Sequence, residues 1–482
     1  MKPIKTVFFL IGVFLLLAVA MWATPAGGIK VGTFTFHLPS FSEMFLDEGP
    51  QYVDVSHIVE EQFDIDSVLM PGNEESTPEI LAANYDSLVA KIHRIELNDT
   101  ARQNLYGFFK RLEKDTLVRI MHYGDSQIEG DRMTAFIRNR LQKKFGGTGI
   151  GLRPALQPYD FVLSAVQENS GNWMRYPLYG RIDSTIQHNK YGPMAAFSRF
   201  APPQPDTLAT DSLVYYEASL AIEKASVALD SSRVYKHFKL YYGNTSEPVS
   251  VQLFSNDTFI AQDTLLPTVD FARLEIDLPD TTSQVSVHFS GYDSPDIYGF
   301  EVASKSGVIM DNIALRGSSG VFFTRNDFLH SQKAYKALMP DLFILQFGGN
   351  TVPYLTEAEK IVSYGRWFRA QIARLKKTCP HAAIIVIGPS DMSTKQKEFY
   401  VTYEHLPGLV ETLKQVALSE GCGYWDMFDA MGGKNSMPSW VNADPELARP
   451  DYVHFSMRGA RLIANMFYNA LIFEYNNYLQ NK

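Results

Sequence analysis

The stretch "VRIMHYGDSQIEGDRM", residues 118–133, marks the start of an α/β fold. An apolar run over 118–121 stops at Gly124-Asp125-Ser126, and a helical pattern follows whose apolar face contains Met133, Phe136, Ile137 and Leu141. Ser126 therefore lies between a buried strand and a helix. It either caps the helix, because its oxygen accepts free N–H groups of the first turn, or acts as a nucleophile. The second role needs a base, an orienting acid and an oxyanion hole elsewhere in the chain.

Strand and helix patterns alternate again after residue 306. Apolar strand patterns lie at 308–315, 341–348, 382–388 and 423–429, with helical patterns at 357–377 and 405–421. Together with the strand that ends at Gly124, this alternation predicts a parallel sheet covered by helices on both faces.

The segment 161–305 has a different pattern. Apolar and polar residues alternate with a period of two in stretches such as 212–223, 237–243, 249–255, 272–278 and 283–291. Alternation bounded by turn residues predicts an antiparallel β-sandwich. We therefore expect a β domain inserted between the first strand-helix unit of the α/β domain and its second strand. The glycines of "FGGTGIG", residues 145–151, are interpreted as the turn into this insert.

The net charge of −9 over 482 residues is concentrated near the N-terminus. Residues 31–90 contain 12 acidic residues and neither Lys nor Arg, so the rest of the chain is nearly neutral. A nucleic-acid-binding protein would need a basic face, which this balance does not favour. Residues 26–90 are interpreted as an acidic linker or stalk, with docking to a basic partner as the alternative.

The first 25 residues form a membrane anchor or a signal segment. Lys2 and Lys5 precede an apolar run over 7–23, and Pro25 ends it. The length is near the lower limit for a membrane-spanning helix, while Ala18-Val19-Ala20 also resembles a signal cleavage site. We favour an uncleaved anchor with the N-terminus inside. In both cases the rest of the chain is exported, either anchored and facing the periplasm or cell exterior, or periplasmic after cleavage.

Catalytic residues of an open parallel sheet lie at the carboxyl ends of its strands. Beside Ser126, such ends hold Gly320 in "ALRGSSG", Asn350 in "QFGGNTV", and Asp451 with His454 in "RPDYVHFSMRGARL". His454 is a candidate base for the Ser126 hydroxyl, and Asp451 would hold the imidazole tautomer. Asn350, Gly320 and the Ser126 N–H are candidate oxyanion donors. Each residue alone suits an ordinary loop, but the ordered set favours a catalytic site.

The blocks "YGDSQIEG", "LRGSSG", "FGGN" and "DYVHFS" resemble, in this order, those of the SGNH (GDSL-type) hydrolases. The resemblance covers about 100–160 and 308–482. It implies a flavodoxin-like three-layer α/β domain with carboxylic ester hydrolase activity. It also implies Ser126 as nucleophile, His454 as base, Asp451 as its orienting acid, and Gly320 and Asn350 as oxyanion donors.

Within the second block, Gly320 is preferred to Gly317 as the oxyanion donor. The family's donor is usually the later glycine of an Asn-x-Gly-x-x-Gly-like turn. Leu315 stands here in place of the family's asparagine.

The long separation of the first two blocks resembles the bacterial peptidoglycan or polysaccharide O-acetylesterases of this family, in which a carbohydrate-module-like sandwich is inserted at this place. The expected organisation is an anchor or signal at 1–25, a linker at 26–90, and hydrolase segments at 91–160 and 306–482 around an inserted β-sandwich at 161–305.

The resulting hypothesis is an esterase that removes O-acetyl or similar small acyl groups from a cell-envelope or extracellular glycan through an acyl-enzyme. An O-acyltransferase using the same acyl-enzyme is one alternative, and a non-catalytic carbohydrate-binding envelope protein is another. No cofactor or metal is expected. Asp125, Glu129 and Asp131 are interpreted as helix-start acids favoured by the macrodipole, not as metal ligands.

The two cysteines, Cys379 and Cys422, each precede one of two consecutive strand patterns. Neighbouring parallel strands would bring them within disulfide range. Two buried free thiols are equally compatible with the sequence.

Overall fold

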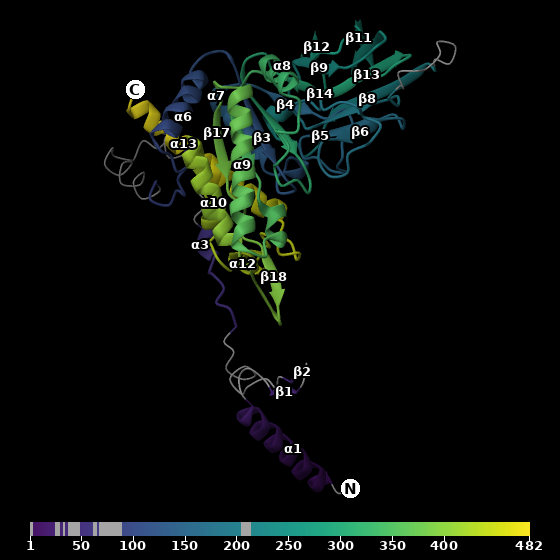
Figure 1. Cartoon of the computed structure of the whole chain (residues 1–482). Helices are drawn as coiled ribbons and strands as arrows, with labels where there is room; N and C mark the ends of the chain where they lie inside the picture. Colours follow the sequence, from purple (N-terminus) through teal and green to yellow (C-terminus); the bar gives the residue numbers. More distant parts are fainter. Residues whose placement is uncertain are drawn as a thin grey trace. The chain divides into compact units, whose positions relative to one another are not determined.

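The computed structural model describes residues 3–24, 29–31, 34–36, 49–60, 65–66, 89–203 and 214–482 (Figure 1). Contacts divide the chain into two compact units, Met1–Tyr52 with Gln396–Phe399, and Val53–Lys395 with Tyr400–Lys482. The second unit holds the parallel sheet and the β domain. Much of the expected linker, 26–90, lies outside the described residues.

The first unit contains helix α1 (Pro3–Ala23) and the short antiparallel strands β1 (Ile29–Val31) and β2 (Phe34–Phe36). Residues Ile4–Trp22 have a mean hydropathy of 2.5 and are long and apolar enough to cross a membrane. An uncleaved anchor and a signal segment both have this length and composition.

A five-stranded parallel sheet forms the centre of the second unit, in the order β15-β3-β16-β17-β20. The strands are β3 (Leu117–Gly124), β15 (Gly307–Ala314), β16 (Pro340–Gln346), β17 (Ala383–Ile387) and β20 (Gly423–Trp425). All residues of β3 except the first are buried. Strands buried on both faces have continuous apolar runs, and the predicted α/β domain is confirmed.

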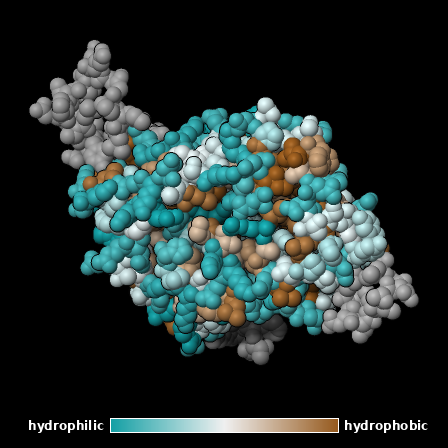
Figure 2. Space-filling view, turned by 90° about the horizontal axis from the view of Figure 1, so that it is seen from above, coloured by the Kyte–Doolittle hydropathy of each residue, from teal (hydrophilic) through white to brown (hydrophobic). Residues whose placement is uncertain are grey.

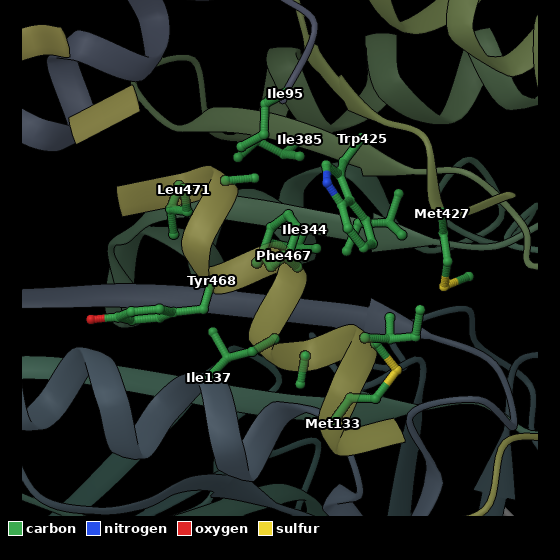
Figure 3. Close-up of a cluster of buried hydrophobic side chains, with 14 of the residues drawn as sticks. Ile95, Met133, Ile137, Ile344, Ile385, Trp425, Met427, Phe467, Tyr468 and Leu471 are labelled. Atoms are coloured by element: carbon green, nitrogen blue, oxygen red, sulfur yellow. The ribbon is translucent and has the colours of Figure 1, made fainter. Parts of the chain in front are cut away.

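Helices cover both faces of this sheet. One core contains side chains of α6 (Asp99–Leu112), α7 (Thr134–Phe145) and α13 (Met457–Gln480), and the other contains side chains of α8 (Phe328–Leu338), α9 (Ala358–Thr378) and α10 (Leu406–Ser419). Adjacent residues of β16 point to opposite cores. Ile344 packs in the first core (Figure 3), whereas Phe343 and Leu345 pack in the second. The three-layer arrangement follows from this alternation.

The remaining short elements lie in the segments that connect the main helices and strands or precede them. They are α3 (Ser56–Glu60), η1 (Glu129–Asp131), η4 (Gly349–Tyr354), α11 (Met427–Ala430), α12 (Ser436–Asn442) and the paired strands β18 (Ser393–Gln396) and β19 (Phe399–Thr402). On the face shown in Figure 2, hydrophilic residues predominate and hydrophobic ones are scattered among them. This is the composition of an ordinary water-exposed protein surface.

The β domain consists of two antiparallel sheets and confirms the predicted insertion (Figure 1). One sheet has the order β11-β10-β13-β8-β5, and the other has the order β12-β9-β14-β7-β6. Side chains of both sheets, such as Leu253 and Phe300, share one core. The strands are β5 (Ala165–Asn169), β6 (Met174–Pro177), β7 (Ala196–Arg199), β8 (Tyr216–Lys224), β9 (His237–Gly243), β10 (Val249–Ser255), β11 (Thr258–Leu265), β12 (Ala272–Asp277), β13 (Gln284–Gly291) and β14 (Asp296–Ala303).

The pairing of the β domain begins earlier in the chain than expected. The expected first hydrolase segment, 91–160, includes β4 (Gly149–Arg153), but this strand pairs antiparallel with β14 of the insert. Gly147 makes the turn after α7 with a φ of +103°, and a Cβ there would lie 2.4 Å from the backbone of Val308. The chain therefore enters the insert directly from this glycine turn.

A buried ionic cluster joins the two domains. Arg119 of β3 donates to both carboxylate oxygens of Asp311 at 2.9 Å and is ion-paired with Glu301 of β14. Lys239 of β9 lies 3.4 Å from the other oxygen of Glu301. The side chains of Arg119, Asp311 and Glu301 are at most 1% exposed, so each charge depends on its partners.

Cys379 and Cys422 precede the neighbouring strands β17 and β20, as expected, yet both are free thiols. Both side chains are buried, and burial raises the pKa of each thiol to about 12. The structure therefore corresponds to the alternative of two buried free thiols.

Candidate active site

The predicted site residues follow the carboxyl ends of neighbouring strands. Ser126 comes directly after β3, Gly320 lies in the turn after β15, and Asn350 follows β16. Because these three strands are adjacent and parallel, their carboxyl ends meet at one edge of the sheet. Asp451 and His454 lie in the loop that precedes α13.

A hydrogen-bonded chain connects Ser126, His454 and Asp451. Ser126 Oγ lies 2.9 Å from His454 Nε2, and His454 Nδ1 lies 2.8 Å from Asp451 Oδ2. The other oxygen of Asp451 accepts the backbone N–H groups of Val453 and His454, both at 2.9 Å. Burial alone would raise the pKa of Asp451, but these hydrogen bonds outweigh it and lower the pKa. An ionised Asp451 accepts Nδ1–H, which leaves Nε2 free to accept the serine proton.

Ser126 does not cap the following helix. Helix α7 begins at Thr134, its N-cap residue Met133 makes no side-chain capping bond, and the short turn η1 lies between this helix and Ser126. The Ser126 hydroxyl instead contacts His454. The capping interpretation of Ser126 is therefore wrong.

Asn350 is held by two acceptors beside Ser126. Its Nδ2 donates to Asp125 Oδ2 at 3.1 Å and to the backbone oxygen of Ser318 at 3.2 Å. Ser126 and Asn350 line the same cavity. The two bonds fix the orientation of the amide, and they engage both of its N–H groups.

Gly320, the preferred oxyanion donor of the sequence analysis, is not among the residues that line the cavity. Its N–H donates to Ser318 Oγ at 3.2 Å, and a Cβ at this position would lie 2.6 Å from the ring of Phe347. Gly317, the less favoured candidate, lines the cavity instead. The reason is that the turn is compact, and the Ser318 hydroxyl within it accepts the Gly320 N–H.

The three carboxylates near Ser126 were interpreted from the sequence as acids at the start of a helix. In the structure each of them also has a specific side-chain partner. Asp125 is buried and holds Asn350, Glu129 pairs with Arg316 through two bonds of 2.5 and 2.6 Å, and Asp131 forms a buried ion pair with Arg138. Burial raises the pKa of Asp125 to about 6, while hydrogen bonds from Gln127 and Asn350 act against that shift. Among the described residues, no group of three or more His, Cys, Asp or Glu could hold a metal ion.

Ser126, His454 and Asp451 line a cavity of about 690 Å³. Its wall carries three arginines, Arg132, Arg316 and Arg449, and the aromatic residue Tyr354, which is 74% exposed. Sequence reasoning missed these four residues. Only the position of Arg132, six residues after the candidate nucleophile, could have pointed to one of them.

Comparison with known families identifies the class of protein. Residues 282–462 match the GDSL-like lipase/acylhydrolase family. By this match, the hydrolase part of the chain is a domain of the SGNH/GDSL type, a class of carboxylic ester hydrolases. The match begins in the insert, just before β13, and therefore does not include Ser126, which the insert separates in sequence from the other blocks.

The fold is similar to that of a solved structure. A peptidoglycan O-acetylesterase structure has 19% sequence identity and a TM-score of 0.59, covering 78% of this chain and 96% of that chain. This coverage exceeds the two hydrolase segments, so the similarity in fold includes part of the insert. An acetylxylan esterase from Geobacillus stearothermophilus has 20% identity and a TM-score of 0.27, covering 35% of this chain and 74% of that one. No curated protein sequence matches significantly.

Proposed function

We propose that this protein is an exported, membrane-anchored serine esterase that removes O-acetyl or other small acyl groups from a cell-envelope or extracellular glycan. The observation that carries the proposal is the hydrogen-bonded chain from Asp451 through His454 to Ser126, with contacts of 2.8 and 2.9 Å. This order of acid, imidazole and hydroxyl is the arrangement that activates a serine for acyl transfer.

In the acylation step, Ser126 Oγ attacks the carbonyl carbon of the ester while His454 Nε2 takes the hydroxyl proton. The tetrahedral intermediate then expels the sugar oxygen, which receives that proton from His454. The acyl group remains on Ser126 as an ester. In the second step a water molecule attacks this ester, His454 takes a proton from the water, and acetate leaves as Ser126 regains its proton.

The oxyanion of each intermediate is stabilised by the Ser126 N–H and by Asn350 Nδ2, once one Asn350 N–H leaves Asp125 or the Ser318 oxygen. A further donor is a backbone N–H of the turn 315–320. Gly317 lines the cavity, whereas Gly320 can donate only when Ser318 Oγ releases its N–H.

Three features support a glycan as the acyl carrier. The exposed ring of Tyr354 on the cavity wall offers an apolar face for a sugar ring. The β domain enters and leaves the hydrolase next to β3 and β15, and so adds surface close to the catalytic strands. The apolar helix α1 is suited to hold the enzyme at a membrane and on the exported side.

The test compares the wild-type chain with Ser126→Ala on p-nitrophenyl acetate and on O-acetylated cell-wall glycans. Acetate release and transfer of acetyl to added sugars are measured together, because an acyl-enzyme can pass its acyl group to water or to a hydroxyl. Ser306→Ala, at an exposed turn outside the cavity, serves as the matched control. Loss of both products in Ser126→Ala alone supports the proposal, and retained hydrolysis contradicts it.

A further inference from the structure

Arg132 lies in the wall of the cavity that Ser126 and His454 also line, and one of its terminal nitrogens has no partner. The residue is 8% exposed, and its Nε donates to the backbone oxygen of Glu129 at 2.8 Å. Among the described residues, Nη1 is buried without a hydrogen-bond partner, and Nη2 reaches only to 3.8 Å from Glu129 Oε1. A nearly buried guanidinium with unsatisfied donors is costly, because protein has replaced the water that would otherwise solvate it.

The neighbouring charges do not supply the missing acceptor. Glu129 is already engaged by both bonds from Arg316, and Asp451 is engaged by His454. Arg449, also in the cavity wall, has no hydrogen bond or ion pair from its side chain to any described residue. Burial lowers the pKa of Arg132, and the positive charge of Arg449 lowers it further. The two guanidiniums thus line one cavity, and the carboxylates beside them, Glu129 and Asp451, each already have another partner.

We infer that Arg132 and Arg449 bind a carboxylate of the substrate, so that the preferred substrate is an acylated acidic sugar. The inference rests on the proposed esterase function and specifies its substrate class. A guanidinium presents its N–H groups in a planar fork that matches the two oxygens of a carboxylate. A carboxylate in this place would satisfy the unused donors of Arg132 and reduce the repulsion between the two arginines. It would also fix the sugar relative to Ser126, which lines the same cavity.

Two kinds of sugar carry a carboxylate. One is a uronic acid, and the other is an amino sugar with an ether-linked carboxylic acid, such as muramic acid. Each is tested with a matched pair of substrates in which only the carboxylate changes. The first pair is O-acetylated polygalacturonate and its methyl ester. The second pair is an O-acetylated muramic acid disaccharide with a free lactyl carboxylate and the same disaccharide with that carboxylate amidated. Acetate release from the full chain gives kcat/KM for each substrate.

We expect the wild-type enzyme to prefer the free carboxylate in at least one pair by roughly 10- to 100-fold, the size of one hydrogen-bonded charge interaction. Arg132→Gln should reduce that ratio to near one through KM, and Arg132→Lys should restore part of it. Arg449→Gln should reduce the ratio less, because Arg449 is more exposed. The control Arg366→Gln, on the exposed surface of α9, should keep the wild-type ratio.

The two proposals fail in different ways. Cleavage of p-nitrophenyl acetate with equal rates on both members of both pairs would overturn the carboxylate site and leave the esterase function standing. A preference that Arg132→Gln does not change would also overturn the role of Arg132. No cleavage of any ester would overturn the proposed function and, with it, this inference.

Discussion

Ser126 Oγ lies 2.9 Å from His454 Nε2, although 328 positions of sequence separate the two residues. The parallel sheet makes this contact possible, because β3 ends at the same edge as the loop that precedes α13. The long β domain between them leaves the sheet after α7 and returns at β15, so it does not disturb this edge. Ser126 and His454 therefore meet through the topology of the sheet.

Ser126 and His454 should act as one unit in catalysis. We expect Ser126→Ala and His454→Ala each to lower kcat for p-nitrophenyl acetate by at least roughly 10³-fold, and the double variant to be no worse than either one. Single-turnover and steady-state rates of the three variants measure this. Additive losses would mean that the two residues do not share the same step.

Asp451 should act through the tautomer of His454. In Asp451→Asn the amide can donate to Nδ1, which would place the imidazole proton on Nε2 and remove the acceptor for the Ser126 hydroxyl. We expect kcat to fall by about 10²- to 10⁴-fold, with a small change in KM. The matched control is Asp257→Asn at an exposed turn of the insert. A loss expressed mainly in KM would contradict an orienting role.

Asp125 should make the stability of the protein depend on pH. Burial raises its pKa to about 6, above the value of about 3.9 for an unfolded chain. The folded state therefore holds this proton more tightly, and the stability it contributes is present below about pH 3.9 and is lost as the pH rises through 6.

Asp125→Asn cannot ionise and should remove this dependence. We expect the unfolding free energy of the wild type minus that of the variant to fall by about 2–3 kcal/mol between pH 4 and pH 7. Urea denaturation at the two pH values measures the difference. A difference that stays constant with pH would show that Asp125 ionises as freely in the folded state as in the unfolded chain.

The sequence predicted most of the fold because its elements are locally encoded. The period-2 stretches 237–243 and 249–255 coincide with β9 and β10, and the apolar run before Ser126 is β3. The order of the four blocks also indicated the residues that meet at the sheet edge. What the sequence did not encode locally are contacts between distant segments. The bond between Asp125 and Asn350, 225 positions apart, is one such contact.

The turn 315–320 and the arginines of the cavity also depend on contacts between residues that the sequence alone does not specify. Whether Gly317 or Gly320 faces the cavity depends on where the Ser318 hydroxyl bonds, which a single sequence does not specify. Arg132 and Arg449 are two of 44 basic residues, and only the folded chain brings them to one wall. The start of the insert was missed because β4 is short and glycine-rich, and its partner β14 lies at the far end of the insert.

Glu301 should stabilise the junction of the two domains. Its carboxylate is buried against Arg119, and Glu301→Ala would leave that guanidinium with Asp311 as its remaining ion-pair partner. We expect a loss of about 3–5 kcal/mol in unfolding free energy, the cost of removing one partner from a buried ion pair. Glu223→Ala, on the exposed side of β8, should change stability by less than about 0.5 kcal/mol. If Glu301→Ala and Glu223→Ala both changed the unfolding free energy by the same small amount, the junction would not depend on the ion pair between Arg119 and Glu301.

The two cysteines should remain reduced and slow to react. Cys379 and Cys422 are 3% and 2% exposed, and burial raises the pKa of each thiol to about 12. Because the thiolate is the reactive form, we expect almost no reaction of the native protein with a thiol reagent at pH 8. After denaturation without a reductant, two thiols per chain should titrate at once, and Cys379→Ser should leave one. Detection of no thiol in the denatured, unreduced chain would contradict the free-thiol structure and would support a disulfide between the starts of β17 and β20.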